Sequence, residues 1–159
     1  MEKVFGFDNY HEGKDQVFKK NFNSQLGFKK LFYCDEVTIK NKEQEDAIKV
    51  VVNDNIEIER KFKDVERIRN HVNLYISSNN LDAIRITADD RRFSIVNLTD
   101  KKLIEIMSDE EIKALFDDDN VDKLCQYLYY RDIDVDGMRK VFLTERTEQV
   151  REAVLSEWQ

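Results

Sequence analysis

The chain has 159 residues, which is the size of one domain and leaves little room for a second. Apolar residues make up 41% and aromatic residues 11%, which excludes a disordered polypeptide of low hydrophobicity. No stretch is apolar enough to cross a membrane and the N-terminus lacks the apolar run of a signal peptide, so we expect a cytoplasmic protein with no membrane partner. The two cysteines, Cys34 and Cys125, lack the spacing of a metal or disulfide framework and are expected to be reduced core thiols.

The net charge of −7 is distributed unevenly along the chain. Residues 1–75 carry 14 basic and 14 acidic side chains, whereas residues 76–159 carry 12 basic and 19 acidic ones. Within the first half, residues 60–69 contain five basic and only two acidic side chains. The acidic total argues against a protein coated in nucleic acid, but the basic segment is suited to one localised loop that contacts phosphates.

The first half of the chain shows apolar runs that end in polar residues. Residues 31–34 are apolar and stop at Asp35 and Glu36, which predicts a buried parallel strand with two carboxylates at its C-terminal end. Apolar residues at helical spacing predict an amphipathic helix over residues 43–52. Alternation at Ile56 and Ile58 predicts a strand that runs into an exposed turn at residues 61–64, and residues 74–76 predict another strand.

The pattern changes from strands to helices in the second half. Residues 93–96 predict one more strand, after the charged loop at residues 89–92. Ser108 and Glu111 form a capping-box pattern at a helix start, and further helices are expected around residues 124–128 and 150–158. The acidic run at residues 117–119 is expected to be a solvated loop between helices. The chain is therefore predicted to be an α/β protein, with a core over residues 1–100 and a C-terminal helical subdomain over residues 101–159.

Polar side chains at the ends of predicted strands suggest a nucleotide-hydrolysing site. Asp35 is suited to anchor the hydrated magnesium that bridges the phosphates, and Glu36 to orient or deprotonate the attacking water. Asn79 follows the next strand and can hydrogen-bond a phosphate or the water, while Arg91 and Arg92 offer guanidinium groups to a phosphate on a neighbouring subunit. By itself, an Asp-Glu pair after a strand is more often a plain solvated loop than such a site.

Five segments in order carry a resemblance to a known family. Residues 32–36 look like a Walker B strand, and residues 53–64 resemble the B′ element, whose hairpin points basic side chains into a central pore. Residues 75–79 resemble motif C with its sensor asparagine, residues 90–93 an arginine-finger loop, and residues 128–132 a leucine-rich segment of the helical part. In this order they resemble the superfamily 3 helicases of phages, plasmids and other mobile elements, especially the C-terminal motor of primase-helicase proteins.

The resemblance implies an AAA+-type motor that forms a homo-oligomeric ring and uses ATP and magnesium to move single-stranded DNA. Asp35 would hold magnesium, Glu36 would activate water, Asn79 would sense the γ-phosphate, and Arg91 or Arg92 would act on the neighbouring subunit. Lys61 and Lys63 would contact DNA phosphates in the pore. Without the resemblance, a plain exposed hairpin is the preferred interpretation of the turn at residues 61–64.

The family's Walker A loop has no counterpart in the sequence. Gly13-Lys14-Asp15 does not replace it, because Asp15 stands where a metal-binding hydroxyl is needed. We therefore expect a truncated motor that is inactive by itself, needs no cofactor as it stands and binds single-stranded DNA weakly. The resemblance also implies that the absent strand would lie beside the motif C strand. The alternative is a non-enzymatic α/β module for interaction or oligomerisation.

A second acidic pattern resembles the opening of a calcium-binding loop. Asp132, Asp134, Asp136 and Gly137 have the required spacing, but Leu143 stands where a bidentate glutamate is needed. An Asp-rich turn between helices is the expected structure.

Overall fold

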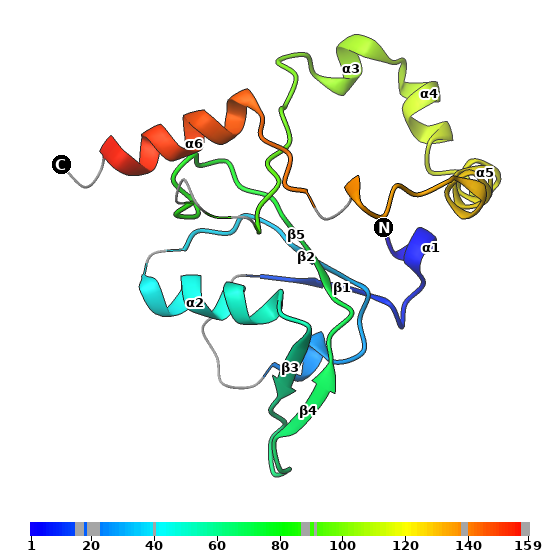
Figure 1. Cartoon of the computed structure of the whole chain (residues 1–159). Helices are drawn as coiled ribbons and strands as arrows, with labels where there is room; N and C mark the ends of the chain where they lie inside the picture. The colour runs from blue at the N-terminus through cyan, green and yellow to red at the C-terminus, as the bar shows by residue number, and fades with distance from the viewer. Residues whose placement is uncertain are drawn as a thin grey trace.

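The fold is a mixed α/β arrangement with a small parallel sheet, a separate hairpin and several helices, as the computed structural model in Figure 1 shows. It describes residues 1–14, 18, 23–39, 41–86, 90, 92–137 and 140–156. The predictions for Arg91 and for the end of the last helix at Trp158 concern residues outside this set. Among the described residues, no helix has the length and apolar character needed to cross a membrane.

The sheet contains three parallel strands in the order β1-β2-β5. Their bounds are Tyr10–Gly13 for β1, Leu31–Cys34 for β2 and Asn73–Ile76 for β5. The central strand β2 is the most apolar of the three, and Phe32 and Cys34 are fully buried within it. The predicted strand that ends at Asp35 is therefore confirmed, as is the one that ends before Ser77.

Helix α2, Lys42–Val51, follows β2 and confirms the predicted amphipathic helix. The side chain of Asn41 caps its start by accepting a 3.0 Å hydrogen bond from the backbone N–H of Gln44. Ile48 and Val51, on one face of the helix, belong to the main hydrophobic core together with β2. Burial of this face stabilises α2 more than helix propensity does, because an isolated helix of this length is marginal in water.

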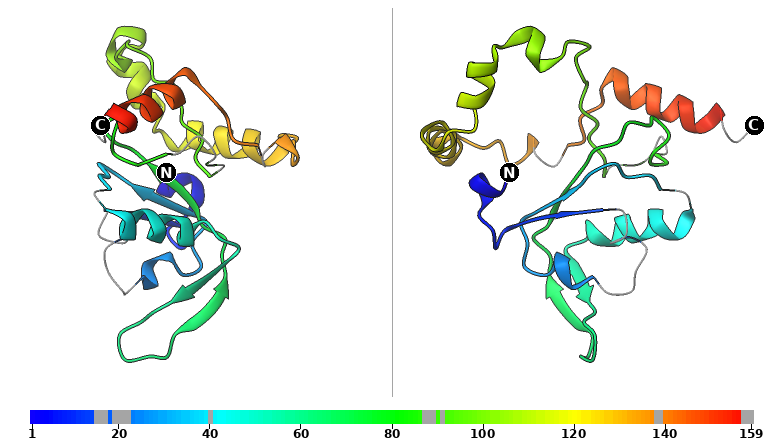
Figure 2. Two further views of the ribbon diagram at one scale, coloured as in Figure 1. Left: turned by 60° about the vertical axis from the view of Figure 1, so that its left-hand side comes forward. Right: turned by 180° about the vertical axis from the view of Figure 1, so that it is seen from behind.

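Strands β3, Asn55–Ile58, and β4, Glu66–Arg69, form an antiparallel hairpin that extends away from the sheet (Figures 1 and 2). One face of the hairpin joins the core through three isoleucines, namely Ile56, Ile58 and Ile68. Asn23, just before the short 3-10 helix η2 at Ser24–Leu26, fixes β3 from the side. Its amide donates to the carbonyl of Glu57 at 2.8 Å and accepts from the N–H of Glu59 at 2.9 Å.

The second half of the chain is helical, with α3 at Leu103–Ile106, α4 at Asp109–Ala114, α5 at Asp118–Tyr130 and α6 at Glu145–Ser156. The capping box at the start of α4 is confirmed, with Ser108 and Glu111 hydrogen-bonded to each other's backbone N–H. Of these four helices, α6 contributes buried apolar side chains to the described structure, whereas α3, α4 and α5 contribute none. The short helix α1, Glu2–Phe5, contacts α5 through a 2.6 Å ion pair between Lys3 and Asp118. The division into residues 1–100 and 101–159 stays a prediction.

Three local predictions are wrong. Residues 93–96 do not form a strand, because they pair with no other strand among the described residues and a strand needs a backbone partner. The acidic run is not a loop, since Asp117 is the N-cap of α5 and Asp118 begins the helix, where acidic side chains favour the helix dipole. Cys125 is only partly buried, so it is not the core thiol that was expected, whereas Cys34 is.

Candidate functional site

The carboxyl ends of the three parallel strands meet at one edge of the sheet, as parallel pairing requires. Lys14 follows β1, Asp35 follows β2 and Ser77 follows β5. The segments after β2 and β5 are also bonded to each other: the N–H of Ser77 donates to the carbonyl of Cys34 at 2.9 Å, and that of Val37 to the carbonyl of Ser77 at 3.1 Å. Side chains from different strands are thereby brought together at this edge, which we call the carboxyl-edge site.

Asp35 is held as an ionised carboxylate by hydroxyl donors. The hydroxyl of Ser77 donates to Asp35 Oδ1, and the hydroxyl of Tyr33 lies 3.0 Å from the same oxygen and 3.2 Å from Ser77 Oγ. The bond from Ser77, followed by that from Tyr33, holds the pKa of Asp35 below its usual value, and the positive charge of Lys14 acts in the same direction. Asp35 is exposed, so this carboxylate is accessible to a cation from solvent.

Glu36 adopts an unusual backbone conformation beside this carboxylate. Its φ of 51° lies in the left-handed region, where non-glycine residues are uncommon. Such a conformation costs of order 1–3 kcal/mol and persists only where the surrounding structure imposes it. The bond from Val37 to the segment after β5 supplies that constraint, so Glu36 projects from a fixed, exposed turn next to Asp35.

Asn79 lies two residues beyond Ser77 and is exposed. The segment that carries it is fixed to the segment after β2 by a 2.7 Å hydrogen bond from the N–H of Ile39 to the carbonyl of Ala83. The structure therefore brings three predicted residues, Asp35, Glu36 and Asn79, to the same edge of the sheet. It gives no contact between Asn79 and Asp35.

Arg92 has its partner in Asp90 and not in the side chains around Asp35. The guanidinium Nη1 of Arg92 lies 3.6 Å from Asp90 Oδ2, and the backbone N–H of Arg92 donates to Asp90 Oδ1 at 2.8 Å. The Asp90 side chain is only 6% exposed, whereas that of Arg92 is 46% exposed. A role on a neighbouring subunit would require Arg92 to leave this pairing. Arg91 lies outside the described residues.

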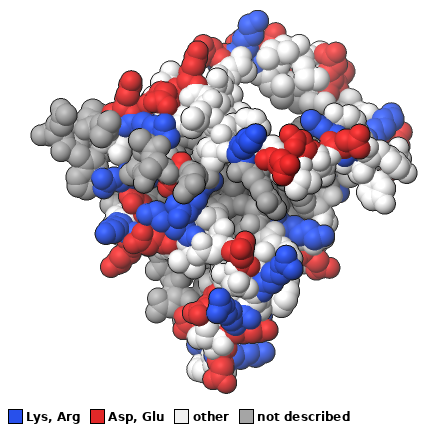
Figure 3. All heavy atoms as spheres, in the orientation of Figure 1, with Lys and Arg blue, Asp and Glu red and all other residues white. Residues whose placement is uncertain are grey.

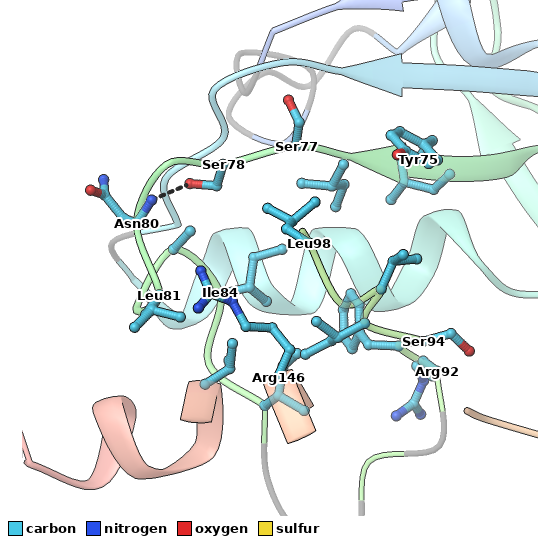
Figure 4. A pocket seen from close by; sticks show the side chains of 18 of the residues that line it. Tyr75, Ser77, Ser78, Asn80, Leu81, Ile84, Arg92, Ser94, Leu98 and Arg146 are labelled. Carbon is cyan, nitrogen blue, oxygen red and sulfur yellow. Dashed lines mark hydrogen bonds between the residues drawn. The ribbon is translucent and has the colours of Figure 1, made fainter. Parts of the chain in front are cut away.

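A cavity of about 310 Å³ lies along the outer edge of β5 (Figure 4). Residues 74–78 line one side, residues 92–96 and Leu98 another, and Arg146 and Val150 of α6 a third. The N–H groups of Asn73 and Ser77 point toward β2, so those of Leu74 and Ile76 point toward the cavity by the alternation of a strand. Among the described residues, this edge of β5 pairs with no strand.

The hairpin presents basic side chains at its far end, which we call the hairpin tip, residues 60–63. The N–H of Lys63 donates to the carbonyl of Arg60 at 3.2 Å and closes a four-residue turn. Arg60 also forms a 2.7 Å ion pair with Glu66 across the hairpin. Lys61 and Lys63 are exposed on either side of Phe62, and basic and acidic side chains alternate over this end of the surface (Figure 3). The tip is separate from the carboxyl-edge site.

The donor set at the carboxyl-edge site suits magnesium better than calcium or zinc. Within the described part of the chain, no group of three or more acidic, histidine or cysteine side chains can enclose a metal ion. Magnesium commonly binds through one or two carboxylates and keeps water and phosphate oxygens as its other ligands, which one ionised Asp35 permits.

At residues 132–137, Asp134 accepts a 2.9 Å bond from the N–H of Gly137 and so forms part of a turn.

Sequence reasoning missed the residues that surround Asp35. The sequence pattern assigns no role to Tyr33, Lys14 or Ser77. Tyr33 occupies the half-buried position of an otherwise buried strand, and Ser77 and Lys14 each follow a strand directly. Their meeting depends on the register that places Tyr33 opposite Tyr75 and Cys34 opposite Ile76, which sequence alone does not provide.

Comparisons with known proteins agree with the fold. Three apo structures of the NrS-1 C terminal region match with TM-scores of 0.81, 0.79 and 0.76 at 20%, 21% and 20% sequence identity. Each match covers 96% of this chain and 38%, 37% and 36% of the respective NrS-1 chains. The chain thus spans less than two fifths of the length of these structures, and at this identity the likeness concerns the fold.

No curated protein matches the sequence. A protein family described as a family of unknown function, DUF5906, matches residues 1–92. The matched segment contains the whole parallel sheet, the carboxyl-edge site and the hairpin. The chain therefore belongs to the DUF5906 family.

Proposed function

We propose that the chain forms the magnesium-binding and DNA-contacting part of a superfamily 3 helicase motor of the AAA+ type, as found in primase-helicase proteins. The observation that carries the proposal is the carboxyl-edge site. Two adjacent parallel strands are followed directly by Asp35 and Ser77, whose side chains are hydrogen-bonded, with Glu36 in a constrained turn beside them. The fold likeness to the NrS-1 C terminal region supports the same proposal.

Each residue of the carboxyl-edge site has a distinct task in this proposal. Asp35, ionised and oriented by Ser77 and Tyr33, would hold magnesium, which neutralises phosphate charge when bound. Glu36 would accept a proton from the attacking water. Asn79 would donate an amide hydrogen bond to the terminal phosphate, and Arg92, once released from Asp90, would reach a neighbouring subunit. ATP hydrolysis also requires a phosphate-cradling loop, which these 159 residues do not contain.

The chain by itself is expected to show no ATPase activity above background. Asp35 and Glu36 cannot replace the backbone amides and lysine that bind the phosphates and stabilise the transition state. Steady-state phosphate release with magnesium and ATP measures this, with Glu36→Gln as the matched variant. Turnover that disappears in Glu36→Gln would show a complete site within the chain and would contradict the proposed division of labour.

Weak, salt-sensitive binding of single-stranded DNA is expected from the hairpin tip. Lys61 and Lys63 are exposed and not paired with acidic side chains in the described structure, so they are available to phosphates. Fluorescence anisotropy with a labelled oligothymidine at low salt should show reduced affinity and a smaller salt dependence for Lys61→Ala/Lys63→Ala, because phosphate contacts release counterions. Lys101→Ala/Lys102→Ala, two exposed lysines on the helical part, is the matched control.

Equal affinity of the tip variant and the native chain would reject the hairpin as a DNA contact. The second candidate function would then gain weight, namely an interaction or oligomerisation module. A specific observation favours it: many large apolar side chains of α3, of α5 and of the segment before α5 are exposed, including Ile104, Phe116, Tyr129 and Tyr130. Contiguous exposed apolar surface is typical of a protein interface.

A further inference from the structure

The hairpin tip carries an aromatic ring that has no packing role within the chain. Phe62 is 92% exposed, more than any other large apolar side chain among the described residues. Its ring contacts the ammonium of Lys61, which lies 5.0 Å from the ring centroid. A ring so exposed leaves most of its surface accessible to a flat partner from solvent.

The backbone at Phe62 is also unusual. Its φ is 62°, in the left-handed region, and it occupies the third position of the turn that the bond from Lys63 to Arg60 closes. A positive φ at this position favours glycine or asparagine, and a bulky side chain there is a genuine outlier. The chain thus places a large ring where glycine would fit with less strain, and the ring gains no burial in return. This combination points to a contact outside the chain.

The charges around the ring indicate the kind of partner. Exposed lysines flank Phe62 on both sides. Of the acidic side chains that follow the tip, Asp64 is exposed and Glu66 is engaged by Arg60. Lysines beside an exposed aromatic ring suit a partner that combines phosphates with flat bases. Unpaired bases expose their faces, whereas bases in a duplex are already stacked on one another, so the arrangement suits a single strand.

We propose that Phe62 is a base-stacking residue for single-stranded DNA, with one base resting on the ring while Lys61 and Lys63 contact the flanking phosphates. This inference rests on the proposed DNA-binding function of the hairpin tip and adds a ring contact that phosphate attraction alone does not require. It predicts that affinity depends on the presence of bases, and not only on the number of phosphates.

Tryptophan fluorescence at the tip tests stacking directly. The chain has one tryptophan, Trp158, so the variant Phe62→Trp/Trp158→Phe carries a single fluorophore at the tip. Titration at low salt compares an oligothymidine with an abasic strand of the same number of phosphates. Saturable quenching by the oligothymidine and little by the abasic strand is expected. Equal quenching by both strands, or a response only to anionic lipid vesicles, would overturn the proposal.

Affinity measurements separate the ring from the charges. Phe62→Leu keeps an apolar side chain, and Phe62→Gly suits the turn. A loss of DNA affinity in these two variants therefore cannot be attributed to a distorted backbone. Both are expected to weaken oligothymidine binding roughly 5- to 150-fold, the range of base–aromatic stacking, while leaving the salt dependence unchanged. Native affinity in both variants, together with a reduced salt dependence in Lys61→Ala/Lys63→Ala, would reject stacking and leave the DNA-binding proposal intact. No binding by the native chain would reject both.

Discussion

Phe32→Ala is expected to lower the free energy of unfolding by about 3 to 5 kcal/mol, the range for removing a buried phenylalanine side chain. Phe32 is fully buried in β2, the central strand of the parallel sheet. Its ring lies 5.1 Å from the ring of His11 and fills the space above Gly13, where an added Cβ would approach Phe32 Cζ to 2.7 Å. Truncation therefore leaves a cavity that touches both β1 and β2.

Chemical denaturation followed by circular dichroism measures this loss. Because a domain of this size is commonly stable by only 5 to 15 kcal/mol, the variant should unfold at much lower denaturant or fail to fold. Phe28→Ala is the matched control, since the same atoms are removed from a side chain that is 65% exposed. Its effect should stay within about 0.5 kcal/mol. Similar losses in both variants would mean that β2 is not the centre of the core.

Amide exchange along β5 should alternate between slow and fast residues. The N–H groups of Asn73 and Ser77 donate to the carbonyls of Lys30 and Cys34 at 2.8 and 2.9 Å and should be strongly protected. The N–H groups of Leu74 and Ile76 face the cavity beside β5, where the described structure offers no strand, and should exchange orders of magnitude faster. Hydrogen exchange followed by NMR resolves the four residues individually.

The same unpaired edge should promote self-association, since exposed strand edges pair with other chains. Light scattering over a concentration series is expected to show a mass that rises with concentration, and protection of Leu74 and Ile76 should rise with it. A strict monomer in which both amides are already protected would show that another segment closes the sheet in solution. The expectation that the absent strand of the motor family lies beside β5 would then be wrong.

The strands found from sequence are those whose burial leaves a clear pattern. Strand β2 is an apolar run, and β5 ends in a polar segment, so both were predictable. Strand β1 contains Glu12 and His11 and lies at the sheet edge with one side open, so its sequence does not resemble a buried strand. Residues 93–96 alternate between half-buried and exposed side chains, but no strand among the described residues pairs with them. Alternating apolar residues therefore indicate side-chain packing and do not by themselves indicate backbone pairing.

The carboxyl-edge site was predictable in outline but not in detail. Asp35 and Glu36 could be identified because polar residues directly after a parallel strand must lie at the sheet's carboxyl edge. The hydroxyls that orient Asp35 come from Tyr33 and Ser77, and their positions follow from strand register. The pairing of Arg92 with Asp90 is a local contact that no periodicity reveals.

Two asparagines hold the hairpin, one near its tip and one at its base. Asn23 is bonded to the tip-side end of β3, at Glu57 and Glu59, and Asn70, just after β4, donates to the carbonyls of Val51 and Asn53 at the end of α2. Between these two points the isoleucine face of the hairpin packs into the core. A load applied at the tip would therefore be carried past Asn23 and along the hairpin to Asn70 and the end of α2, the helix whose other end begins shortly after Asp35 and Glu36.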